Sequence, residues 1–134
     1  MSHVVTADEF ERVVEREFAF LRDAGLDGPV IERRDEELRA GFAGADLRIR
    51  VHCDAGCDDV LTVVERPLLG RQLLLETIHA LTVGDARYPA AGGGSWPSPD
   101  ALERRLALEA TLLRENLAAA AEDDALYEEA GRDA

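Results

Sequence analysis

The chain has 134 residues, of which 46% are hydrophobic and 32% charged, and its formal net charge at pH 7 is −13. These values predict one globular domain over residues 1–134, with frayed ends at about 1–5 and 131–134. They argue against direct nucleic-acid binding, because phosphate contacts need a cationic surface, and no apolar run approaches the ~18 residues of a membrane span.

The first residues lack the basic, apolar and small-residue order of a cleaved signal, so we expect a cytoplasmic protein. Cys53 and Cys57 are the only cysteines. In a reducing compartment we expect them to be a buried small hydrophobe and a loop thiol rather than a disulfide.

An N-terminal helix is predicted from Thr6 to Gly25. Thr6 and Glu9 have the spacing of a capping box, and Gly25 is suited to end the helix. Apolar residues recur at three and four positions and form one stripe. They are Phe10, Val13, Val14, Phe18, Leu21 and Ala24.

A hairpin over Asp46–Arg66 is the clearest strand signal. Arg48, Arg50 and His52 alternate with apolar residues, which is typical of a strand with one buried face. Two earlier strands are predicted at Val30–Arg33 and Glu36–Phe42. Four apolar residues in the second half of the hairpin interrupt the alternation, which favours either burial on both faces or a bulge. They are Val60, Leu61, Val63 and Val64.

The C-terminal half is predicted to be helical. Leu68–Leu81 is apolar nearly all round, so it is expected to face both the sheet and another helix or a second subunit. After a loop over Gly84–Pro99, Ser98 and Pro99 begin a helix that runs to about Ala121. Asp123 or Asp124 then caps a short helix through Glu129.

These patterns together predict an α+β protein. An N-terminal helix precedes a three- to four-stranded antiparallel β-meander, and two to three C-terminal helices pack on one face of the sheet.

No catalytic signature is visible, so we expect no enzyme activity and no cofactor. His52, Cys53 and Cys57 lie near three aspartates and are the densest set of potential metal ligands. Adjacent strand residues point to opposite faces, however, and a tetrahedral site needs four convergent ligands. We therefore expect no metal site.

Five residues are candidates for binding a partner. Arg48, Arg50 and His52 form the only basic stripe. They are expected either to contact a carboxylate or phosphate or to pair across the sheet with Glu37 or Glu65. Tyr88 and Trp96 are aromatic residues in a loop. They either anchor an interface or pack on the chain's own helices.

Several motifs carry a resemblance to known proteins. They are the capped first helix, Leu-Arg-Ile-Arg-Val-His-Cys-Asp54, the Leu-rich segment after Pro67 and the Ser98-Pro-Asp-Ala-Leu-Glu-Arg-Arg-Leu106 restart. Over most of residues 6–130 the chain resembles small bacterial α+β proteins of mostly uncharacterised families, which include immunity proteins of polymorphic toxin systems. The resemblance implies protein binding and supplies no catalytic residues. The Gly92–Gly94 stretch and His52-Cys53 depart from the pattern.

We therefore predict a non-enzymatic protein-binding module, with an acidic surface that neutralises a basic protein partner as an immunity-type inhibitor does. Two alternatives stay open. One is a homodimeric accessory or structural protein joined through Leu68–Leu81. The other is a small-molecule or metal-binding protein.

Overall fold

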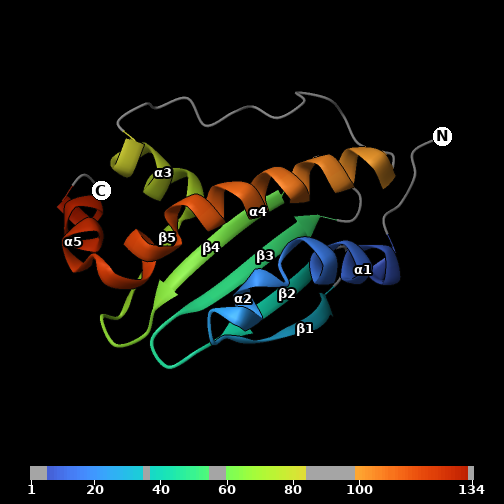
Figure 1. Cartoon of the computed structure of the whole chain (residues 1–134), viewed down its shortest axis with the longest axis horizontal. Coiled ribbons are helices and arrows are strands. Elements are labelled where there is room, and N and C mark those ends of the chain that lie inside the picture. Colours follow the sequence, from blue (N-terminus) through green and yellow to red (C-terminus); the bar gives the residue numbers. More distant parts are fainter. Residues whose placement is uncertain (1–5, 35–36, 55–59, 84–98, 133–134) are drawn as a thin grey trace.

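The computed structural model describes residues 6–34, 37–54, 60–83 and 99–132 (Figure 1). Five strands form one sheet in the order β1-β2-β3-β4-β5, and each strand pairs antiparallel with the next. The strands are β1 Asp27–Arg34, β2 Glu37–Ala43, β3 Arg48–Asp54, β4 Val60–Arg66 and β5 Arg71–Leu74. The predicted meander is confirmed, but the strand number of three to four is wrong.

The fifth strand comes from the first half of the predicted helix Leu68–Leu81. Pro67–Gly70 form a turn, Gly70 has a φ of +64°, and α3 (Leu75–Val83) begins only after β5. A short apolar run fits a buried strand as well as a helix, and pairing with β4 decides between them here. Leu68 is therefore 79% exposed in a turn, and the two-faced helix that suggested a homodimer does not form.

The N-terminal helix starts as predicted and then divides. The Glu9 N–H donates to Thr6 Oγ1 over 3.1 Å at the start of α1 (Ala7–Glu17). The chain leaves the helix at Phe18 and forms the short α2 (Phe20–Asp23), after which Gly25 adopts a φ of +96°. This break lets both Phe18 and Leu21 be fully buried.

The C-terminal helices also follow the prediction. α4 covers Pro99–Glu122 with Pro99 at its first position, and α5 covers Asp124–Arg132. Asp123 caps α5, because its Oδ1 accepts from the Leu126 N–H over 3.3 Å. α5 ends at Arg132, and residues 1–5, 133–134 and Ser98 lie outside the described residues. None of the described helices is long and apolar enough to cross a membrane.

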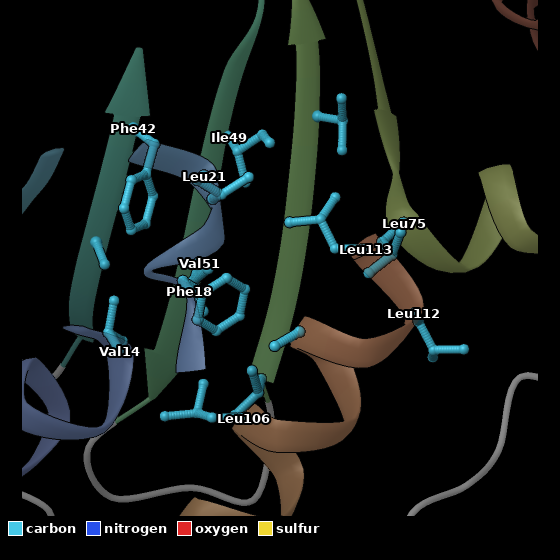
Figure 2. Close-up of a cluster of buried hydrophobic side chains, with 14 of the residues drawn as sticks. Val14, Phe18, Leu21, Phe42, Ile49, Val51, Leu75, Leu106, Leu112 and Leu113 are labelled. Atoms are coloured by element: carbon cyan, nitrogen blue, oxygen red, sulfur yellow. The ribbon is translucent and has the colours of Figure 1, made fainter. Parts of the chain in front are cut away.

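The helices form a layer on one face of the sheet (Figure 1). α1 contacts β1 and β2, α3 and α4 contact β4, and α5 contacts β5. Figure 2 shows the resulting core, in which side chains from three elements or more meet. They include Val14 of α1, Phe18 at the break between α1 and α2, Leu21 of α2, Phe42, Ile49 and Val51 of the sheet, and Leu106 and Leu113 of α4. The opposite face of the sheet has no such cover among the described residues.

Candidate functional site: the open face of the sheet

Polar residues on the inward side of β4, and an apolar residue on its outward side, explain why its sequence was ambiguous. Burial alternates regularly along the strand, so neither predicted alternative, two-faced burial or a bulge, is correct. Thr62 and Arg66 point inward although they are polar, and Leu61 points outward with 39% of its surface exposed. Thr62 is satisfied there, since its Oγ1 donates to Glu109 Oε1 over 3.0 Å.

The sheet register places five residues in one line across the face opposite the helices, which we call the open face. Paired residues of neighbouring strands share a face. We call this line the central row. It consists of one residue from each strand, namely Val30, Gly41, Arg50, Val63 and Leu74. It is apolar except for Arg50. Val30 is 63% exposed, and the other four are partly exposed.

A three-residue cluster borders one side of the central row. Glu37 Oε1 accepts from His52 Nδ1 over 2.6 Å and from Arg39 Nε over 2.7 Å. These bonds, with His52 first, lower the pKa of Glu37 below its ordinary value and outweigh the opposing effect of burial. Because an ionised carboxylate can only accept, Nδ1 of His52 carries the hydrogen.

A second ion pair borders the other side of the central row. Arg48 on β3 and Glu65 on β4 are register partners, and Arg48 Nη1 lies 3.9 Å from Glu65 Oε1. Arg39, Arg48 and His52 beside the central row are therefore paired with acids, while the row itself is apolar apart from Arg50.

Arg50 differs from the other cations of the open face. Its Nη2 donates to Gln72 Oε1 on β5 over 2.8 Å, and its buried Nε has no acceptor within the part of the chain that the structure describes. No described carboxylate forms an ion pair with it. Arg50 thus brings a cation to the centre of the face without a compensating anion among the described residues.

Three of the five predicted site residues meet on this face. Arg48 and His52 pair with Glu65 and Glu37, as one of the two sequence alternatives expected, whereas Arg50 pairs with a neutral glutamine. Tyr88 and Trp96 lie outside the described residues. Sequence reasoning missed Val30, Gly41 and Leu74, since only the strand register shows that they share a row.

The potential metal ligands are separated as the strand pattern predicts. Cys53 is 2% exposed in the core, whereas His52 is on the open face. Among the residues that the structure describes, no three or more His, Cys, Asp or Glu side chains are placed to hold a metal ion. Cys57 falls outside those residues.

We expect Glu37→Gln to lower the free energy of unfolding by about 0.5 kcal/mol at pH 7, since the pair is partly exposed. The folded state lowers the pKa of Glu37, so its contribution is complete above the ordinary value of 4.5 and disappears as the pH falls through the lower folded value. Urea unfolding of parent and variant at pH 7 and at about pH 3 measures this. In a His52→Ala background the difference between the two should shrink, and a pH-independent difference would contradict the assignment.

Comparison of the chain with family models, with curated proteins and with solved structures finds no match. The resemblance to immunity proteins therefore stays a prediction from the sequence. The function is inferred below from the geometry of the open face.

Proposed function

We propose that the chain is a non-enzymatic protein-binding module that receives a partner protein on the open face. The observation that supports this proposal most is the exposed central row, which crosses the whole sheet and is bordered by paired charges. Protein interfaces commonly have an apolar centre that includes an arginine and a polar rim. The open face has this arrangement.

The size of the open face bears on the kind of complex. Five strands spaced about 4.8 Å apart span roughly 19 Å, and a similar length along the strands gives an area on the order of 400 Å². A standard interface uses about 800 Å² from each partner. The partner is therefore expected to contact neighbouring loops as well, or to bind transiently.

The net charge of −13 favours a partner that is basic overall. Exposed acidic residues are present on α1 and at the end of α4, among them Glu15, Glu115 and Glu122. Opposite net charges accelerate encounter over distances near the Debye length. An immunity-type inhibitor, which occludes a toxin, fits both features: long-range attraction brings the partner, and the open face contacts it.

Capture from a lysate of the native host tests the proposal. The tagged parent is compared with Leu61→Glu on the open face and with Ala118→Glu, which introduces the same charge at an exposed position of α4. We expect a protein that the parent and Ala118→Glu retain equally and that Leu61→Glu retains at least about ten-fold less. Circular dichroism should show all three folded.

Two outcomes would refute this function. In the first, the parent retains no protein beyond what the tag alone retains. In the second, Leu61→Glu retains the same protein as strongly as the parent. A loss seen only when Glu115 and Glu122 are both replaced by arginine would place binding on the helix layer instead of the open face.

A further inference from the structure

Gly41 lies in the middle of the central row, although the fold does not require glycine there. Its φ lies outside the region from +20° to +160° that favours glycine. A Cβ added to it would meet only the Val30 carbonyl oxygen, at 3.9 Å. Gly28 is different. It has a φ of +136°, and a Cβ there would lie 2.5 Å from the Gly41 carbonyl oxygen. A glycine inside a strand weakens the strand, and it often marks a bulge or a place where a ligand or another backbone approaches closely. The register shift of β1 lies between Asp27 and Val30, and a Cβ at Gly41 would leave it undisturbed, which favours close approach.

The neighbours of Gly41 indicate what could approach it. Val30 and Arg50 are its register partners on β1 and β3, so an exposed apolar side chain and a cation stand on either side of it. Arg39 and Arg48 already bind Glu37 and Glu65. Arg50 alone among these arginines lacks a described carboxylate partner.

We propose that the open face docks a partner segment that places an apolar side chain over Gly41 and a carboxylate against Arg50. This inference rests on the proposed protein-binding function and specifies its partner. Arg50 is only partly buried and has no described carboxylate partner, and an arginine binds a carboxylate more strongly than a neutral acceptor such as Gln72. The segment is therefore acidic and apolar at the point of contact, whatever the net charge of the protein that carries it.

Gly41→Val is the most informative variant, because its side chain fills the space above residue 41 on the open face and also raises the strand propensity of β2. Valine fits a pleated strand, and the structure has room for its Cβ, so the midpoint of thermal unfolding should stay the same or rise. Arg50→Glu tests the charge. Arg104→Glu, at an exposed position of α4, is the matched control.

The probe is a random peptide library displayed on phage and selected on the folded parent. We expect the selected peptides to be enriched in Asp or Glu beside an apolar residue. The most enriched peptide should bind Gly41→Val and Arg50→Glu at least about ten-fold more weakly than the parent. Replacing its acidic residue by lysine should restore binding to Arg50→Glu, while Arg104→Glu should bind as the parent does.

Several results would overturn the inference. The selection could enrich basic peptides or no peptide, or a selected peptide could bind Gly41→Val as tightly as it binds the parent. A third such result is self-association of the parent that Gly41→Val abolishes, because a second copy of the chain would then be the occupant. If the parent captures a host protein and Leu61→Glu does not, while the peptide selection gives one of these results, only this inference is lost. If no host protein is captured, the proposed function itself fails.

Discussion

Phe18→Ala is expected to lower the free energy of unfolding by about 4 kcal/mol. Phe18 is 0% exposed, and its ring stacks between those of Phe20 and Phe42, with centroids 6.3 and 6.2 Å away. Phe18 lies at the break between α1 and α2 and packs against Phe42 of β2, so truncating it leaves a cavity between the helix layer and the sheet. Domains of this kind are typically stable by about 5–15 kcal/mol, so the loss is a large share.

Phe20→Ala is the matched control for that cavity. Phe20 is only partly buried, on the helix side of Phe18, and the Arg114 guanidinium lies over its ring, 4.6 Å from the centroid. We expect a loss of about 1–2 kcal/mol from this truncation. Denaturant unfolding with unchanged m-values measures both variants. Equal losses would contradict the central position of Phe18 in the core.

Arg66→Ala is expected to lower the free energy of unfolding by about 3 kcal/mol. Arg66 is 7% exposed. Its Nε and Nη2 lie 2.9 and 2.7 Å from Asp46 Oδ2, and Nη1 lies 3.0 Å from Asp124 Oδ1 in an ion pair without hydrogen-bond alignment. The guanidinium also lies 5.7 Å from the centroid of the Tyr127 ring. The side chain thus links β4 to the β2–β3 connection and to α5.

The pKa of Asp46 gives this prediction a second test. The Leu68 N–H and then Arg66 lower it below its ordinary value of 3.8. The part of the stability that comes from Asp46 is therefore present above that value and lost as the pH falls through the lower folded one. In Arg66→Ala this acid-sensitive part should shrink.

Arg71 provides the control for Arg66, since it is the exposed register partner on β5. We expect Arg71→Ala to change the free energy of unfolding by no more than about 0.5 kcal/mol. If Arg66→Ala were equally mild at pH 7, the three-way link would not contribute to stability.

Local patterns were sufficient to predict the elements whose residues need no distant partner. The Thr6 cap and the alternation along β3 are of this kind. The strand β5 and the burial pattern of β4 were predicted wrongly because distant contacts decide them. Thr62 is satisfied by Glu109, 47 positions away, and Leu73 pairs with Val64 on β4. No local pattern distinguishes a polar residue that finds a buried partner from one that faces water.

The candidate site was predicted in part for the same reason. Period-two spacing identified Arg48, Arg50 and His52, because it concerns a single strand. Gly41 and Val30 belong to other strands, and the shift in register between Asp27 and Val30 decides which β1 residue stands beside Gly41. The difference between Arg50 and its paired neighbours likewise depends on Gln72, 22 positions away.

Photocrosslinking in native host lysate tests most directly whether the open face binds protein. A photoreactive residue is placed at Leu61 or Gln72 on the open face, or at Ala118 on the helix layer. We predict that the first two positions crosslink to one and the same host protein and that Ala118 does not. Crosslinks from Ala118 alone, or none from any position, would contradict the assignment of the open face as the binding surface.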